Sequence, residues 1–291
     1  MTAPPMPSPP RPARFPLRAA WSGLMRQRSI WALIGVWLAM TAGFGVVLNA
    51  VLYGSMRETL SPEDADAMRA GLEPGAISQF AAGAMPFYGA AMALLIGVVV
   101  VGGEYRAGTV RWLYTQGPGR LAVIGAQLVA LVGLFAIMAL ATLAVDWVGL
   151  VVVAPVFDMP IAAPAVGPVI VSLAGMWLTA LVHGLIGAAL AVLARGTVWA
   201  LAGGLVWVLA VETALVALVR AVPALGGPAH GLLAVATSNL AVARGAYPWW
   251  PNAVDAAATV ADGWVGAGVL AAWGIVATAV ACVAVVRRDV A

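Results

Sequence analysis

The chain has 291 residues, of which 63% are hydrophobic and only 9% are charged, and its mean hydropathy is +0.98. Soluble domains contain about 45–50% apolar and about 25% charged residues, so this composition excludes a soluble protein. All 15 basic residues are arginines. Without lysine the chain cannot form the G-x-x-x-x-G-K-[ST] phosphate loop. Its two histidines and one cysteine are too few for a metal cluster or a disulfide framework.

The first 29 residues predict two different segments. Residues 1–16 are rich in proline and show no apolar periodicity, which predicts a disordered cytoplasmic tail. Residues 17–29 interleave leucine and tryptophan with arginine, a pattern typical of a helix that lies in the headgroup plane. A plain charged anchor beside the first span is the alternative. We therefore place the membrane domain at 17–291.

Six long stretches with few or no charges follow. Each is long enough for the ~20 residues that cross a ~30 Å hydrocarbon layer, where only helices and closed barrels satisfy their backbone groups. Barrel strands are about ten residues long and alternate in polarity, unlike these uniformly apolar runs. The sequence therefore predicts an all-α membrane protein with helices at about 31–54, 81–102, 121–145, 166–194, 198–219 and 264–286.

The charges predict that both termini are cytoplasmic. Arginines are concentrated in the N-terminal tail, in 102–120 and at the C-terminus, as the positive-inside rule requires for an even number of crossings. Most acidic residues fall in the predicted outer loops, among them Asp146 directly after the third span. The stretch 221–243 has too many proline, glycine and polar residues for a seventh span. Residues 195–197 allow only a tight turn between the fourth and fifth spans.

The most unusual cytoplasmic segment is 102–120, which reads GGEYRAGTVRWLYTQGPGR. Glu104 suits the first turn of a helix, where the helix dipole favours a carboxylate, and the Gly-Pro-Gly at 117–119 ends that helix. The large side chains at 112–114 lie between them. Aromatic and arginine side chains carry much of the energy of protein interfaces, so they indicate a partner protein. A helix packed under its own membrane domain explains them equally well.

The run Gly-Glu-Tyr-Arg-x-Gly-Thr-Val-Arg, followed by Pro118-x-Arg120 and the next span, resembles the signature of ABC-2 type transporter permeases. These are six-helix membrane subunits of ATP-driven exporters. The stretch Trp21-x-x-Leu24-x-Arg26-x-Arg28-Ser29-x-Trp31 is similar to that family's N-terminal interfacial helix. Two positions depart from the pattern. Ala20 stands where an acidic residue is common, and Gln127 stands where a lysine is frequent.

The resemblance implies that the helix after the second span is a coupling helix, which docks on a cytoplasmic ATPase. The residues that it places at or near this contact are Glu104, Arg106, Gly108, Thr109, Arg111, Trp112 and Arg120. It also implies two ATPase chains and a second permease chain, identical or different, in a bacterial cytoplasmic (inner) membrane. ATP and Mg²⁺ would be bound by the ATPase. This chain is expected to be non-catalytic and to bind no cofactor, metal or nucleic acid.

The resemblance further implies re-entrant outer helices within 220–262 and a path between the two permeases that the first, second and fifth spans face. Small residues allow helix backbones to approach closely, and those suited to contact between subunits are Gly43, Gly45, Gly97 and Gly203. Walls rich in Ala, Val, Leu and Trp suit an amphipathic or lipophilic cargo, such as a drug, a peptide or a lipid. The sequence does not identify the cargo or the ATPase.

Two ionisable residues stand inside the predicted fourth and fifth spans. Counted from the tight turn at 1.5 Å per residue, His183 and Glu212 lie at depths that differ by only about one helical turn. They form a pair that locks two helices, or Glu212 lines the export path and attracts a cationic or polar part of the cargo, or the two do not meet.

Three other functions are compatible with parts of the sequence. An intramembrane enzyme needs a nucleophile and a base, yet the spans offer only His183 and Glu212. An ion-coupled secondary carrier would use these residues as a proton relay. A non-transporting membrane anchor or immunity protein needs neither. Association with an ATPase separates the exporter from the last two.

Overall fold

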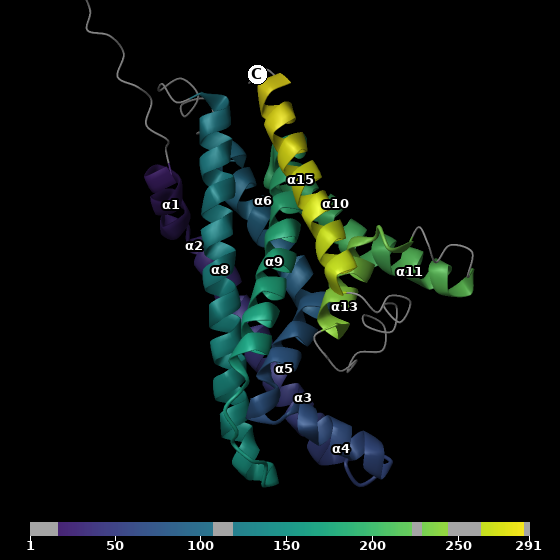
Figure 1. The fold of residues 1–291 in the computed structure, drawn as a ribbon. Coiled ribbons are helices and arrows are strands. Elements are labelled where there is room, and N and C mark those ends of the chain that lie inside the picture. The colour runs from purple at the N-terminus through teal and green to yellow at the C-terminus, as the bar shows by residue number, and fades with distance from the viewer. Residues whose placement is uncertain (1–16, 107–118, 223–228, 244–262, 288–291) are drawn as a thin grey trace, which may run out of the picture.

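The computed structural model describes residues 17–106, 119–222, 229–243 and 263–287. These residues are helical almost throughout and contain no strand. The long helices run side by side in a bundle (Figure 1). The helices long and apolar enough to cross a membrane are Arg28–Met56, Arg120–Phe157, Val166–Ala194, Thr197–Val219 and Gly263–Arg287. The prediction of an all-helical protein with several potential spans is therefore confirmed.

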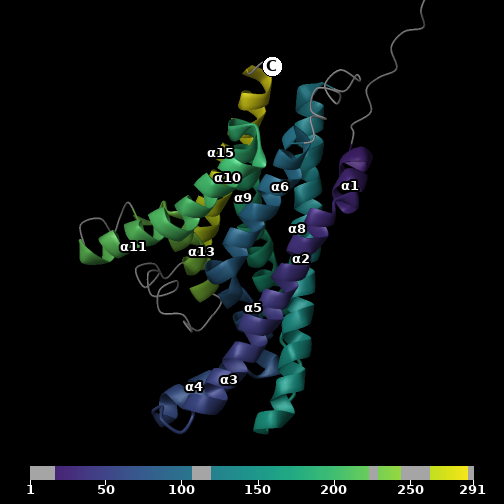
Figure 2. The ribbon, with the colours of Figure 1, turned by 180° about the vertical axis from the view of Figure 1, so that it is seen from behind.

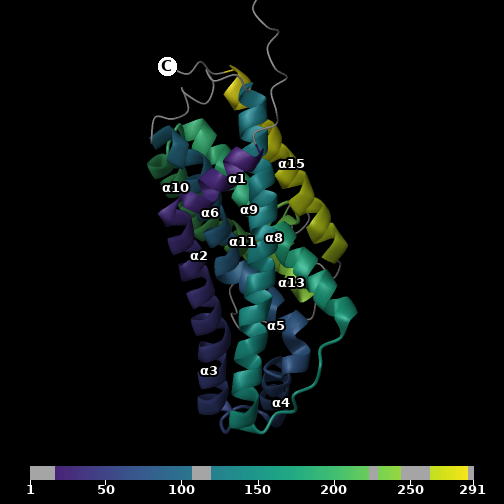
Figure 3. The same cartoon turned by 90° about the vertical axis from the view of Figure 1, so that its left-hand side faces the viewer.

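The chain begins with a short helix and an elbow. Helix α1 (Leu17–Arg26) is followed by Gln27, whose backbone is extended with ψ 111° and separates α1 from the next helix. The Trp31 indole Nε1–H donates to the Met25 carbonyl at 2.8 Å and so bridges this elbow. The first long helix follows as α2 (Arg28–Met40), a π-helical segment η1 (Thr41–Val47) and α3 (Leu48–Met56). It runs alongside α8 (Figure 3).

The second predicted span forms the end of a longer helical stretch. Helix α4 (Pro62–Gly71) is capped by the Ser61 hydroxyl, which accepts from the Asp64 amide. Next come η2 (Pro74–Ala76), α5 (Ile77–Ala84), the π-helical segment η3 (Met85–Gly89) and α6 (Ala90–Arg106). Because η3 divides the stretch, α6 has only 17 residues. This helix is apolar but shorter than the five long ones.

The third predicted span ends too early. Helix α8 runs over Arg120–Val153 and continues into η4 (Ala154–Phe157), whereas the expected span ended at residue 145. Asp146 therefore lies inside α8, not in an outer loop, and its side chain is 1% exposed. A charged residue within an apolar run predicts the end of a span, but the Asp146 side chain faces the interior of the protein. At 1.5 Å per residue the 34 residues of α8 extend roughly 51 Å.

The last helices include one that leaves the bundle. Helix α9 (Val166–Ala194) coincides with the fourth predicted span and ends at Arg195, which is left-handed with φ 52°. After this tight turn, α10 (Thr197–Leu205) packs on α9 and α6, but η5 (Val206–Val211) and α11 (Glu212–Ala221) extend away sideways (Figure 2). Helices α13 (Leu233–Val242) and α15 (Gly263–Arg287) return to pack on each other and on α9.

Glycines allow α6 and α9 to touch backbone to backbone at the centre of the bundle. A Cβ built on Gly97 would overlap the Gly184 carbonyl oxygen, and one on Gly187 would overlap the Leu94 carbonyl oxygen. The sequence suggested that Gly97 contacts a second subunit. In the structure Gly97 packs against α9 of its own chain and is not available for such a contact. Gly45 is likewise covered, here by Asp146 and Phe80. Gly43 and Gly203 have open space beside them.

Candidate functional site

The predicted coupling residues lie partly outside the described residues. Gly108, Thr109, Arg111 and Trp112 belong to 107–118, of which nothing is described. Glu104 lies in the last turn of α6, not in the first turn of a new helix, and Arg106 ends α6. Arg120 begins α8 and donates to the Val285 carbonyl of α15 at 3.5 Å. The structure therefore describes only the helix ends on either side of 107–118, namely the end of α6 and the start of α8.

Glu104 connects the end of α6 with α8. It lies two residues beyond the predicted second span, and burial raises the pKa of its carboxyl. A hydrogen bond from the Gln127 side-chain amide opposes this rise. Gln127 is on α8 and is 7% exposed. Because a carboxylate at a helix C-terminus is disfavoured by the helix dipole, this amide partner has a clear role. It connects the end of α6 to the first turns of α8.

Two other segments converge on the same end of the bundle. A Cβ on Gly102 would contact Thr197 at the start of α10, and one on Gly103 would lie 3.8 Å from the Gln27 side chain at the α1–α2 elbow. The Gly-Gly pair at the start of the motif thus lets α6 pass close to both segments. Arg120 adds a contact with α15 at the same end of the bundle. The described segments that were predicted to be cytoplasmic therefore lie together at this end.

Glu212 is placed by α13. Its carboxylate oxygens accept from the backbone N–H groups of Leu233 and Ala234, each at 3.1 Å, and its side chain is 2% exposed. The Trp207 side chain donates a further hydrogen bond. The first N–H groups of a helix have no partner within it, and the helix dipole favours a negative charge there. Glu212 therefore fixes the outward helix to the N-terminus of α13.

His183 has a different partner. Its Nδ1 lies 2.8 Å from the Thr179 carbonyl oxygen on the same helix, and its side chain is 1% exposed. A carbonyl only accepts, so Nδ1 carries the proton. Within the described part of the chain, the hydrogen bonds of His183 and Glu212 go to these separate partners. The structure therefore does not form the His183–Glu212 pair that the sequence allowed.

A polar cluster around Asp146 was missed by the sequence reasoning. Trp37 Nε1 donates to Thr142 Oγ1 at 2.8 Å, and Tyr88 donates to Thr41 Oγ1 at 2.9 Å. All five side chains are buried, with exposed fractions of 7% or less. The signal was present in the sequence, because the residues at 147–153 after Asp146 are all apolar or glycine. An acidic residue followed by two more apolar turns belongs inside a helix.

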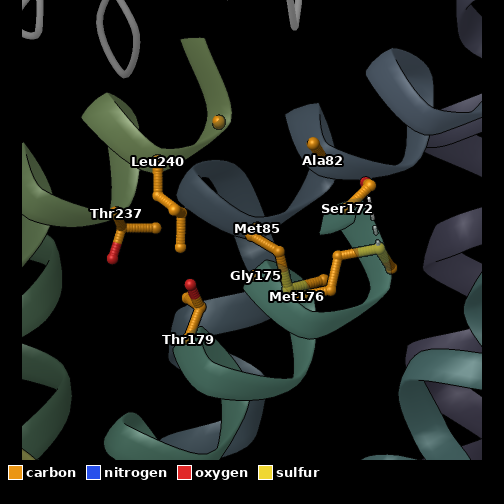
Figure 4. A pocket seen from close by; sticks show the side chains of 9 residues that line it. Ala82, Met85, Ser172, Gly175, Met176, Thr179, Thr237 and Leu240 are labelled. Atoms are coloured by element: carbon orange, nitrogen blue, oxygen red, sulfur yellow. Dashed lines mark hydrogen bonds between the residues drawn. The ribbon is translucent and has the colours of Figure 1, made fainter. Parts of the chain in front are cut away.

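A small void separates α9 from α5, η3 and α13 (Figure 4). Thr179, Thr237, Leu240 and Met85 surround it, and it has room for about one water molecule. The Thr237 hydroxyl is buried and has no hydrogen-bond partner among the described residues. This void is too small for a drug, a peptide or a lipid. A cargo path within the chain is not formed at this place.

No group of three His, Cys, Asp or Glu side chains in the described ranges lies close enough together to hold a metal ion. No protein-family model matches the chain, and no curated protein is detectably similar to it. A functional assignment therefore depends on the residues and contacts described above.

Proposed function

We propose that this chain is the membrane-spanning permease subunit of an ABC exporter, which forms the export path and couples to a separate cytoplasmic ATPase. The observation that carries the proposal is the Gly-Glu-Tyr-Arg motif at the end of α6. Glu104 of this motif is tied to α8, and the glycines before it contact two further segments. A force applied at 107–118 would thus reach α6, α8 and the α1–α2 elbow together.

The composition also supports a separate ATPase chain. A chain without lysine has no P-loop, so ATP and Mg²⁺ would be bound by the partner ATPase. This chain would carry no catalytic residue. We propose that α5–α6 is the second of six spans, that both termini lie in the cytoplasm and that α13 is part of a re-entrant outer segment. The proposal also includes location in a bacterial inner membrane.

The exposed surface supports contact with lipid and with a second permease chain. Helix α11 leaves the bundle (Figure 2), and apolar side chains at the start of α10 are widely exposed, with Trp199 at 79% and Val198 at 72%. In the proposal, two permeases, identical or different, meet through such surfaces and pair with two ATPase chains. An amphipathic or lipophilic cargo then moves between them. Gly43 and Gly203 are the two predicted contact glycines whose surroundings remain open.

Purification of the chain from its native membrane, followed by mass determination of the intact complex, tests the proposal. We expect two permease and two ATPase chains, together with ATP hydrolysis that a suitable lipophilic cargo stimulates. A complex without an ATPase would instead favour the secondary carrier or the membrane anchor. An ATPase whose turnover no cargo changes would favour the immunity protein.

The substitution Glu104→Arg tests the coupling role. It places a positive charge where Gln127 now donates a hydrogen bond and beside the arginines of the motif. Loss of one partner of a charged contact at a protein interface costs about 2–5 kcal/mol, so we expect ATPase binding to weaken by about 30-fold or more. Membrane insertion should be unchanged. Pull-down with the ATPase and cargo-stimulated ATP hydrolysis are the measurements.

Two variants make this result specific. Glu58→Arg makes the same charge reversal at an exposed position between α3 and α4, away from the motif, and should leave ATPase binding intact. Glu104→Gln keeps the shape and a hydrogen bond to Gln127, and it should retain most of the binding. Normal assembly and normal coupling in Glu104→Arg would show that the motif does not dock an ATPase.

A further inference from the structure

Asp146 is a carboxylate in the interior of the helical bundle. Its side chain is 1% exposed. Neither of its oxygens accepts a hydrogen bond from any residue that the structure describes. Unpaired ionisable groups inside membrane proteins are energetically costly and usually serve a function. The protein thus offers two buried carboxylate oxygens as ligands.

The neighbouring side chains offer oxygen atoms but few protons. Tyr88 donates its hydroxyl proton to Thr41, and Thr41 in turn donates to the Trp37 carbonyl at 3.1 Å. The Trp37 indole proton goes to Thr142. Thr142 stands four residues before Asp146 on α8, so the two lie on one face of the helix. The Trp37, Thr41 and Tyr88 donors are therefore used within this layer, and none of them is directed at the carboxylate.

The backbone around Asp146 is also unusual. A Cβ on Gly45 would lie 3.2 Å from Asp146 Oδ1, so the backbone of η1 passes directly beside the carboxylate. Tyr88, which interacts electrostatically with Asp146, belongs to η3. Both η1 and η3 are π-helical. Such wide turns are rare and occur frequently at functional sites, and here two of them face the same buried carboxylate.

We propose that Asp146 binds a small cation from solution, either a proton or Na⁺, inside the membrane domain. Hard cations prefer oxygen ligands, and this position offers the two Asp146 oxygens, with the Gly45 backbone beside Oδ1 and Thr142 one turn away on α8. Tyr88 is the one titratable side chain among the neighbours described here, and Trp37, Thr41, Gly45 and Thr142 carry no charge. A bound cation would neutralise Asp146 and stabilise the packing of α8 against η1 and η3. This inference does not depend on an ATPase.

The test uses the full chain in detergent and follows its thermal unfolding midpoint. NaCl is exchanged for choline chloride at constant ionic strength, and each series is repeated at low and high pH. A cation that binds only the folded protein raises the midpoint. We expect a rise of about 2–4 °C when the cation reaches about ten times its dissociation constant. A response to Na⁺ at fixed pH identifies Na⁺. A midpoint that rises only as the pH falls identifies the proton.

The variant Asp146→Asn should lose this response, whereas Asp158→Asn should keep it. Asp158 is exposed and left-handed with φ 51°, a conformation that asparagine also adopts. If Asp146→Asn does not fold, Gly45→Ala serves instead, because its methyl group crowds Oδ1 and should shift the response to higher cation concentration. An identical response in the wild type and in these site variants, or no response in the wild type, would overturn the proposal.

Discussion

Replacement of Gly97 by alanine is expected to destabilise the protein strongly. A Cβ at this position would overlap the Gly184 carbonyl oxygen and would lie 2.7 Å from the carbonyl carbon, both of them backbone atoms of α9. Backbone cannot rotate away as a flexible side chain does, so α6 and α9 must move apart. Overpacking of this kind costs about 1–3 kcal/mol and sometimes more. Because this crossing lies at the centre of the bundle, we expect a cost at or above that range.

Gly268→Ala is the matched control, because Gly268 also lies in an apolar helix, α15, but no neighbouring segment comes within 4 Å of its Cβ position. It should be nearly neutral or slightly stabilising, since alanine favours helices over glycine. Thermal unfolding in detergent and the yield of monodisperse protein compare the two variants. Equal behaviour would mean that α6 and α9 do not cross as closely as described here.

The long helices could be predicted from the sequence because lipid imposes a simple length requirement. Uncharged runs of ~20 or more residues have few alternatives to a helix, and α9 and α15 accordingly end within a residue of their predicted limits. The tight turn after α9 was also predictable, since only three residues were available for it. Here a single physical requirement determined the structure.

Features that depend on contacts between distant residues could not be predicted. The charge of Asp146 predicts a loop because a charge usually ends a span, yet the π-helical turns beside it are 57 to 105 residues away in sequence. The small size of Gly97 predicts a place at a subunit interface, and only the crossing with α9 shows which backbone it meets. Composition shows that a residue is small or charged but does not show which way it faces.

Glu212 shows the same limit and leads to the second large effect. Counted by depth along a straight helix, its natural partner was His183. The outward course of η5 and α11 instead brings its carboxylate to the N-terminus of α13, where Leu233 and Ala234 donate to it. A helix that leaves the bundle cannot be recognised from apolar composition alone, because every turn of it satisfies the same hydropathy test.

Substitution of Glu212 by alanine should therefore release α13 from α11. Two backbone N–H groups would lose their acceptor in an apolar environment, and each such loss costs about 1–3 kcal/mol. Since water can reach part of a freed helix end, we expect a total of about 2–4 kcal/mol. Glu212→Gln should cost less, because its amide oxygen still accepts one of the two bonds. Unfolding in detergent and hydrogen exchange at the α13 amides report the loss.

Thr213→Ala provides the control, because the Thr213 hydroxyl only donates to the Leu209 carbonyl of its own helix at 2.9 Å and is exposed. That substitution should leave stability and exchange almost unchanged. Export of cationic cargo by Glu212→Gln then separates anchoring from recognition of cargo. If α13 loosens while the relative rates for cationic and neutral cargo stay the same, Glu212 acts as an anchor. If α13 remains protected and only cationic cargo is affected, the carboxylate faces the path and its contacts with α13 are not what holds the outer helix.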